Sequence, residues 1–123
     1  MFTVTIERSF TAGHQLTMPD GRPEEFHSHE WLVECAVAAE WLNEIGVVID
    51  FNELDKKLDI IIGPFEDTRL EKLPFFKKHG INASAENVAK YIFDMLEPQL
   101  DADMSLEYVQ VTEAKACRAK YSK

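Results

Sequence analysis

Three histidines near the start of the chain could hold a metal ion. His27 and His29 are separated by one residue, where a run of alternating apolar and polar residues begins. In a β-strand, residues two apart point to the same face, so these two imidazoles would lie side by side. His14 ends the preceding strand-like run, and a loop joining the two strands would bring it back beside the pair. Three neutral histidines with an open fourth position are typical of a catalytic zinc site.

A His-x-His pair alone is a weak motif, because two exposed histidines at the entrance of a strand have the same spacing. The third histidine favours a metal site, and imidazole is the commonest metal-binding side chain near neutral pH. We therefore expect Zn²⁺ to be bound by His14, His27 and His29.

Two strands should position these histidines. Residues 2–10 alternate between apolar and polar types and are rich in β-forming residues, which predicts a half-buried strand. Residues 15–25 contain two prolines and a glycine, so they should form the loop of a long antiparallel hairpin. The second strand is expected from about residue 29 to residue 40, with one face carrying Trp31, Val33, Cys35, Val37 and Ala39.

Two helices are expected in the second half of the chain. Residues 53–62 place leucine and isoleucine on one helical face, with Asp50 or Asn52 as the cap. Residues 65–80 should form a charged loop. A second apolar helical stripe follows Ser84, which is the expected N-cap.

A second pair of strands, over residues 104–111 and 112–121, should complete the fold. The order ββααββ predicts an α+β protein, with an antiparallel four-stranded sheet and two helices on one face. No internal linker divides the sequence, so residues 1–123 should form a single domain. The uncovered strand face also includes Leu, Val and Trp positions, and open sheet edges invite pairing, so an oligomer is expected.

Charge and hydropathy exclude some partners. The formal net charge of −9 argues against nucleic acid or an anionic membrane, because phosphate binding needs clustered Lys and Arg. No apolar stretch approaches the roughly 20 residues of a membrane-spanning helix, and no signal-peptide pattern is present, so a cytoplasmic protein is expected. Cys35 and Cys117 lack metal or redox spacing and should be buried or semi-buried thiols.

Five motifs in order resemble the 6-pyruvoyl-tetrahydropterin synthase and 6-carboxytetrahydropterin synthase family over almost the whole chain. Residues 10–14 look like F-x-A-x-H, which carries the family's first zinc ligand, and residues 27–29 look like H-G-H with Ser28 in place of glycine. The other matches are residues 46–51 with G-x-V-x-D-F, residues 82–89 with N-P-T-x-E-N-x-A, and Thr112 and Glu113 with the pterin-anchoring position.

The resemblance implies a tunnelling fold, in which trimers close a barrel of strands and two trimers stack into a hexamer. It implies a dihydropterin substrate, commonly 7,8-dihydroneopterin triphosphate, whose side-chain hydroxyls the zinc would polarise. Glu113 would grip the pterin through paired charge-assisted hydrogen bonds, although by itself it could be a solvated strand carboxylate. Thr112, Asp50 and Phe51 are the further substrate-binding residues that it implies.

The sequence departs from the family at its catalytic residues. The family's cysteine before H-G-H is missing, and Glu24 stands three residues before His27, as in a glutamate subclass that makes 6-hydroxymethyl-dihydropterin for folate synthesis. Glu24 is then the expected general base, unless Glu24 and Glu25 are a solvated loop pair. The family's L-D-H-x-x-L is replaced by residues 65–70, which lack the histidine and offer Glu66 and Asp67 as possible catalytic support.

Two functions from different classes remain open at this point. The first is a zinc-dependent lyase acting on the side chain of a dihydropterin. The second is a non-catalytic or repurposed homologue that binds zinc and a pterin but has lost the chemistry.

Overall fold

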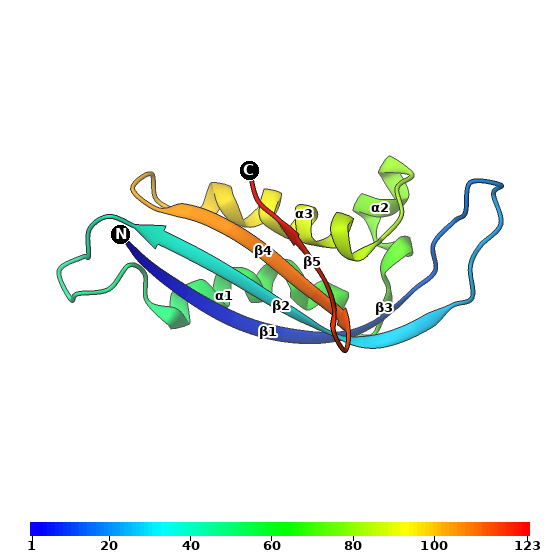
Figure 1. The fold of residues 1–123 in the computed structure, drawn as a ribbon, viewed down its shortest axis with the longest axis horizontal. Helices are drawn as coiled ribbons and strands as arrows, with labels where there is room; N and C mark the ends of the chain where they lie inside the picture. The colour runs from blue at the N-terminus through cyan, green and yellow to red at the C-terminus, as the bar shows by residue number, and fades with distance from the viewer.

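A computed structural model describes all 123 residues, as an elongated sheet with helices packed along one face (Figure 1). The sheet has five strands in the order β3-β1-β2-β4-β5. The strands are β1 (Phe2–His14), β2 (His27–Ala39), β3 (Thr68–Arg69), β4 (Ser105–Ala114) and β5 (Cys117–Tyr121). The α-helices are α1 (Phe51–Ile62), α2 (Pro74–His79) and α3 (Ala85–Leu96), and none is long and apolar enough to cross a membrane.

The expected hairpin of β1 and β2 is confirmed. The two strands pair antiparallel along their whole length, from Phe2 opposite Ala39 to His14 opposite His27. This register places the end of β1 directly beside the start of β2. Strand β4 pairs antiparallel with the other side of β2, so the end of β4 also lies near the histidines.

Both long helices begin at side-chain caps. The Asp50 carboxylate accepts a hydrogen bond from the backbone N–H of Asn52, which identifies Asp50 as the cap of α1. The Ser84 hydroxyl accepts one from the N–H of Asn87 at the start of α3, as the sequence predicts. Such caps satisfy backbone donors that have no partner inside the helix.

The core lies between the sheet and the helices. The expected inner face of β2 is buried throughout, with Trp31, Val33, Cys35 and Val37 fully shielded from solvent. Leu54 and Leu58 of α1 are buried against this layer, and α3 contacts β4 and β5. Trp31 also donates its indole N–H to the Ala12 carbonyl at 3.0 Å, which joins β2 to β1 just before His14.

The structure corrects the prediction between α1 and α3. The expected loop 65–80 contains 3-10 turns, the short helix α2 and the strand β3, which pairs parallel to Ala12 and Gly13 of β1. The sheet is therefore five-stranded and mixed, where four antiparallel strands were predicted. A two-residue strand has too few residues to show alternation, and its pairing depends on β1, which is remote in sequence.

The last two strands also divide differently from the prediction. Strand β4 continues to Ala114, and the turn to β5 contains Ala116 with a positive φ of 65°. Thr112 and Glu113 thus belong to β4 and not to the last strand. Cys117 opens β5 and is exposed, so the expectation of a buried or semi-buried thiol is wrong for Cys117, although Cys35 is buried.

The sheet face without helices is polar, which corrects the premise of the oligomer prediction. Trp31 and Val33 point to the helices, and Leu32, at 36% exposure, is the large apolar residue of β2 on the open face. Glu34 lies on the same open face, where its carboxylate accepts a hydrogen bond from the Tyr108 hydroxyl at 2.6 Å. The open face therefore gives no apolar basis for an oligomer, and the open sheet edges are the remaining one.

Candidate metal centre

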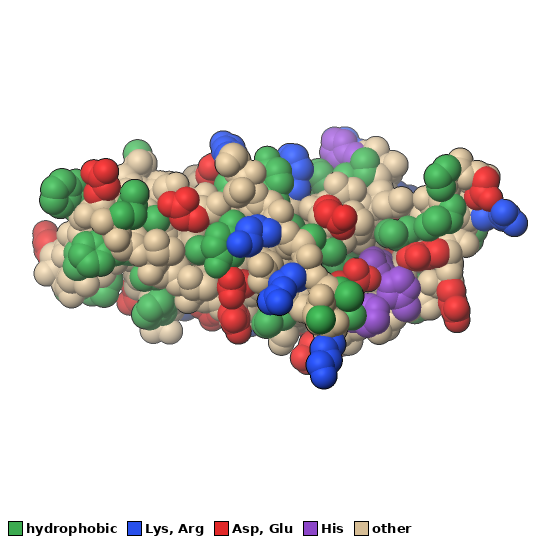
Figure 2. All heavy atoms as spheres, viewed as in Figure 1, with side chains coloured by type: hydrophobic (Ala, Val, Ile, Leu, Met, Phe, Trp, Pro, Cys, Tyr) green, Lys and Arg blue, Asp and Glu red, His purple; other side chains and the backbone are tan.

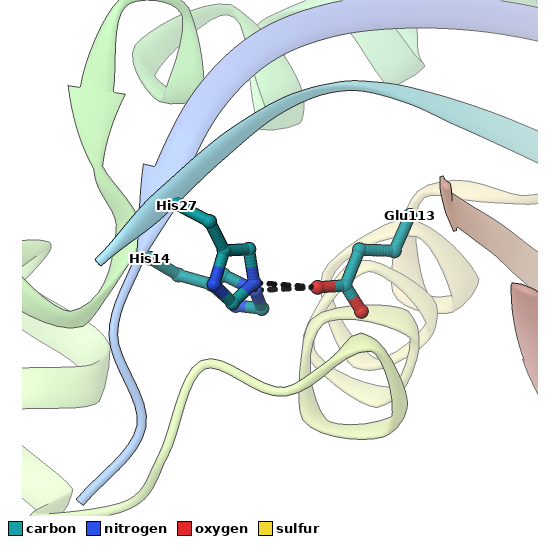
Figure 3. Close-up of side chains that lie close together, drawn as sticks. All are labelled: His14, His27 and Glu113. Carbon is teal, nitrogen blue, oxygen red and sulfur yellow. Dashed lines mark hydrogen bonds and ion pairs between the residues drawn. The ribbon is translucent and has the colours of Figure 1, made fainter. Parts of the chain in front are cut away.

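The ends of three strands bring His14, His27 and Glu113 together (Figure 3). His14 is the last residue of β1, His27 is the first residue of β2, and Glu113 lies near the end of β4. The two Nε2 atoms are 2.5 Å apart, and Glu113 Oε1 is 2.5 Å from His14 Nε2 and 3.1 Å from His27 Nε2. The space-filling view shows histidine side chains at the surface near this end of the molecule, with carboxylates beside them (Figure 2).

The backbone fixes which nitrogen of each histidine faces the centre. His14 Nδ1 is 2.7 Å from the Ala83 carbonyl, and His27 Nδ1 is 3.2 Å from the Glu25 carbonyl. A carbonyl only accepts hydrogen bonds, so each Nδ1 carries the proton and each neutral ring directs an Nε2 lone pair inward. Metal-binding histidines are held in this way by their second ring nitrogen.

A cation is the simplest complement to this arrangement. Two imidazole lone pairs and a carboxylate oxygen converge on one small volume, and without a positive charge between them they repel. Zn²⁺ accepts both ligand types, at about 2.0–2.2 Å. His14 is 1% exposed, so the β1 side of the group is shielded from solvent, while His27 and Glu113 are partly exposed. The donor set therefore fits a divalent metal ion.

In the metal-free chain, a proton on His27 can supply part of the positive charge that a metal ion would bring to these donors. Burial lowers the pKa of His27, but this is outweighed by hydrogen bonds to Glu113 and the Glu25 carbonyl and by the charges of Glu24 and Glu113. The pKa of His27 is therefore raised above its usual value. Protons and metal ions compete for the same Nε2 atom.

The third expected ligand, His29, lies beside this group but is not part of it. Its ring centre is 4.9 Å from that of His27, on the same face of β2. The ligand atoms of His14, His27 and Glu113 all lie within 4.8 Å of one another, and His29 does not join them. The sequence thus identified two of the three converging side chains as ligands, and assigned the third, Glu113, to the substrate.

The expected general base, Glu24, is close to His27 on the side away from Nε2. Glu24 Oε1 accepts a hydrogen bond from the Leu16 backbone N–H at 3.1 Å and lies 3.9 Å from His27 Nδ1. The Glu24 carbonyl also accepts from the Gln15 side chain at 2.9 Å. These contacts hold the loop that precedes β2 against the end of β1.

Glu66 and Asp67 lie along the outer edge of β1. Glu66 Oε2 accepts from the Thr11 N–H at 3.2 Å, and the Asp67 N–H donates to the Thr11 carbonyl at 2.7 Å, with a positive φ of 56° at Asp67. Neither carboxylate belongs to the converging group. The one remaining histidine, His79, packs on Phe75 in α2, with ring centres 4.7 Å apart, and lies outside the converging group.

A single chain does not bring the other expected substrate residues to the centre. Thr112 neighbours Glu113 on β4, but Asp50 and Phe51 stand at the start of α1, beyond the end of β2 that is remote from His27. The Asp50 carboxylate is engaged in capping, and Phe51 is 57% exposed. These two residues therefore lie apart from the converging group of their own chain.

Glu113 also borders a surface hollow that the sequence did not reveal. Its other walls are the start of α3 and the turn between β4 and β5, including Glu86, Cys117 and Arg118. Glu86 lies 27 to 32 positions before Glu113, Cys117 and Arg118 in the chain, and the packing of α3 on β4 brings it beside them. The hollow gives a ligand access to Glu113 from solvent.

Close packing on the opposite face fixes the strand end that carries His14. A Cβ built on Gly13 would lie 2.2 Å from Cζ of Phe26, so the ring of Phe26 occupies the space of the missing side chain. The Arg69 guanidinium lies over the same ring, 4.3 Å from its centre. Glycine is required between Ala12 and His14 because the loop before β2 packs directly on the backbone.

Comparisons with known proteins agree over the whole fold. The family model for 6-pyruvoyl tetrahydropterin synthase matches residues 3–123. The chain is 30% identical over 127 residues to the 6-carboxy-5,6,7,8-tetrahydropterin synthase of Synechocystis, covering 98% of this chain and 93% of that protein. It is 28% identical over 110 residues to the dihydroneopterin monophosphate aldolase of Pyrococcus furiosus, covering 89% and 88%.

Solved structures show the same fold. The Caenorhabditis elegans 6-pyruvoyl tetrahydropterin synthase superposes with a TM-score of 0.78 at 23% identity, covering 100% of this chain and 97% of that one. This match confirms the expected α+β tunnelling fold, and the family model confirms the family resemblance. The chain belongs to the 6-pyruvoyl tetrahydropterin synthase family.

Proposed function

We propose that this protein is a metal-dependent lyase acting on the side chain of a dihydropterin, with 7,8-dihydroneopterin triphosphate as the candidate substrate. The observation that carries the proposal is the convergence of the His14 and His27 Nε2 atoms with the Glu113 carboxylate. Zinc bound there would supply Lewis-acid chemistry and lower the pKa of a side-chain hydroxyl. The names of the Synechocystis and Pyrococcus relatives support a pterin substrate.

In this proposal, different residues of the chain bind the metal, bind the pterin and transfer protons. Histidines 14, 27 and 29 are the proposed metal-binding set, and Glu113, open to the hollow beside α3, binds the N–H edge of the pterin. Glu24 is the proposed general base, with Glu66 and Asp67 as support. A glutamate is also the catalytic residue altered in a solved variant of the Plasmodium vivax 6-pyruvoyltetrahydropterin synthase, which supports a carboxylate in this role.

A second chain is needed to complete the proposed site. Strand β3 pairs with Ala12 and Gly13 only, so the edge of β1 from residue 2 to residue 11 has no strand partner, and β5 is open on its outer side. Such edges pair readily with other strands. We propose that edge pairing builds trimers and that two trimers form a hexamer, in which Asp50 and Phe51 reach the site of a neighbour.

Product analysis tests the proposed reaction. The zinc-loaded protein is incubated with 7,8-dihydroneopterin triphosphate, with and without a chelator, and the products are identified by mass spectrometry. Cleavage to 6-hydroxymethyl-dihydropterin would indicate the carbon–carbon reaction that the name of the aldolase relative suggests. A 6-pyruvoyl or 6-carboxy product would indicate the other branch. The absence of any metal-dependent product would contradict the proposed lyase activity.

Replacement of Glu24 tests the general base. Glu24→Gln keeps the size of the side chain but removes its basicity, so turnover should fall by about 10²–10⁴-fold with little change in pterin affinity. Glu25→Gln is the matched control, because Glu25 is exposed and contributes only its backbone carbonyl to His27. Full activity of Glu24→Gln together with loss of activity in Asp67→Asn would assign the general base to Asp67, at the edge of β1.

One observation favours a second candidate function. The histidine of the family's L-D-H-x-x-L motif has no counterpart at residues 65–70, and neither His79, which lies in α2, nor Cys35, which is buried in the core, takes its place. A homologue that binds a pterin without turning it over would lack this catalytic residue in the same way. Tight, metal-dependent binding of the pterin without any product would establish that alternative.

A further inference from the structure

We propose that a cavity on the helical side of the molecule is a second binding site, whose ligand is a small aromatic carboxylate. The cavity has a volume of about 300 Å³ and lies between the end of α1, the short helix α2 and α3. It shares no residue with the converging group at the ends of β1, β2 and β4. Binding there does not depend on the proposed lyase activity.

The lining of the cavity suits an aromatic ring. Phe65 and Phe76 are buried, and Phe75 and Tyr91 are half-buried around them. The ring of Tyr91 is inclined by 42–50° to each of the three phenylalanine rings, with ring centres 4.5–5.9 Å apart. Inclined rings offer both faces and edges, which are the contacts that a bound aromatic ring prefers. Small-molecule sites are concave and mostly apolar, with volumes from about 300 Å³ upward.

Large apolar side chains stand exposed at the rim of this cavity. Ile60 of α1 is 74% exposed and Met95 of α3 is 45% exposed, and both belong to the lining. Apolar surface that remains in water beside an apolar hollow is typical of a ligand-binding site. A ligand in the cavity would cover part of both side chains.

The charges around the cavity favour an anion. Lys72, Lys77 and Lys78 are exposed and form no ion pair, although residues 73–76 between them line the cavity. The acidic residues close to the lining in sequence already have partners, namely Asp59 with Arg8, Glu66 with the Thr11 N–H, Glu71 with Arg69, Asp94 with Lys90 and Glu97 with Lys123. In a chain of net charge −9, this mouth therefore has unpaired positive charge.

Helical geometry places one of these lysines beside the cavity. In α2, Lys78 follows Pro74 by four positions and Phe75 by three, and both of these residues line the cavity. Side chains three and four positions apart are neighbours on a helix and lean toward its N-terminus. His79 shows this direction, because its ring lies back on that of Phe75 with ring centres 4.7 Å apart. The Lys78 ammonium can thus reach a carboxylate at the mouth, while the aromatic body of the ligand occupies the cavity.

Calorimetric titration with 2-naphthoate tests the proposed site. We expect a dissociation constant below about 1 mM, the value that a modest ligand efficiency gives for a ligand of this size. Added salt should weaken the binding, and 2-naphthalenemethanol, which has the same rings without the charge, should bind more weakly. The titration is made with and without zinc, because a carboxylate can also bind to a metal ion. Affinity should be the same in both, whereas binding that requires zinc would place the ligand at the metal centre and overturn the proposal.

Two variants with matched controls locate the ligand. Met95→Glu puts a negative charge at the rim and should weaken 2-naphthoate by at least about tenfold, because like charges oppose binding. Met18→Glu is its control, since Met18 is also exposed but lies in the loop between β1 and β2. Lys78→Gln should weaken the ligand by about two- to fivefold, the range for an exposed ion pair. Lys115→Gln is its control, in the turn between β4 and β5.

Three results would overturn the proposal. They are no binding of 2-naphthoate at millimolar concentration, equal affinities for the carboxylate and the alcohol, and equal effects of Met95→Glu and Met18→Glu. Circular dichroism shows whether each variant is folded. Because these measurements use neither turnover nor a pterin, failure of the lyase proposal leaves their outcome unchanged.

Discussion

At the scale of single residues, the two cysteines differ in what surrounds the thiol. Cys35 lies in the core on the inner face of β2, and burial, with smaller contributions from the charges of Glu34 and Asp55, raises its pKa to about 12. Cys117 is exposed at the start of β5. Because the thiolate is the reactive form, burial suppresses both the access and the ionisation of Cys35.

A thiol reagent should therefore modify one cysteine of the native chain. At pH 8, Ellman's reagent should react with Cys117 and reach Cys35 only after denaturation. Cys117→Ser should remove the native reaction, and Cys35→Ala should leave it intact. Two equivalent thiols in the native protein would contradict the burial of Cys35.

The raised pKa of His27 should determine how the proposed metal binding depends on pH. Desolvation lowers this pKa, but Glu113, the Glu25 carbonyl and Glu24 raise it by more. Protonated His27 cannot bind a metal, so zinc affinity should be independent of pH above the raised pKa and fall as the pH drops through it. We expect the decline to begin above the ordinary histidine value of about 6.5. Chelator competition at a series of pH values measures it, and a decline that begins only below that value would be the opposite result.

At the scale of elements, the cap of α3 also supports the centre. Ser84 caps the helix, and the preceding residue, Ala83, supplies the carbonyl that orients His14. Ser84→Ala should lower the free energy of unfolding by about 1 kcal/mol, the usual cost of losing such a cap. Urea denaturation of the metal-free protein measures it, with the exposed Ser122→Ala as control. Equal stability of the two variants would show that the cap contributes nothing.

The elements that the sequence predicted well are those with long periodic patterns or local caps. Alternation over the first strand, the capping hydroxyl of Ser84 and the opposition of His14 and His27 all follow from nearby residues. Strand β3, the exposure of Cys117 and the approach of Glu113 to the histidines do not. They depend on pairing and packing between segments remote in sequence, and a two-residue strand has no periodicity to detect. The expectation of Leu, Val and Trp positions on the open face was likewise wrong for Trp31 and Val33, which face the helices.

At the scale of the whole molecule, the unpaired edge of β1 and the open edge of β5 favour association, and the family resemblance implies that the assembly is a hexamer. We expect sedimentation to give a species with roughly six times the 14.1 kDa mass of one chain. Because the open face is polar, edge hydrogen bonds should contribute more to association than apolar burial does. A monomer at micromolar concentration would contradict the hexamer and would leave Asp50 and Phe51 without a route to the site.

The residues that converge at the metal centre are spread over almost the whole chain. His14 and His27 come from its first quarter, the Ala83 carbonyl from its second half, and Glu113 from ten residues before the end. During synthesis, the first hairpin emerges from the ribosome long before β4 can add the carboxylate. A growing chain thus has the two imidazoles early but assembles the full set of donors only when its last strands have folded. Under the proposed metal binding, the site reaches its final form only after the last strands have folded, so a metal-sensitive probe would time the maturation of the chain.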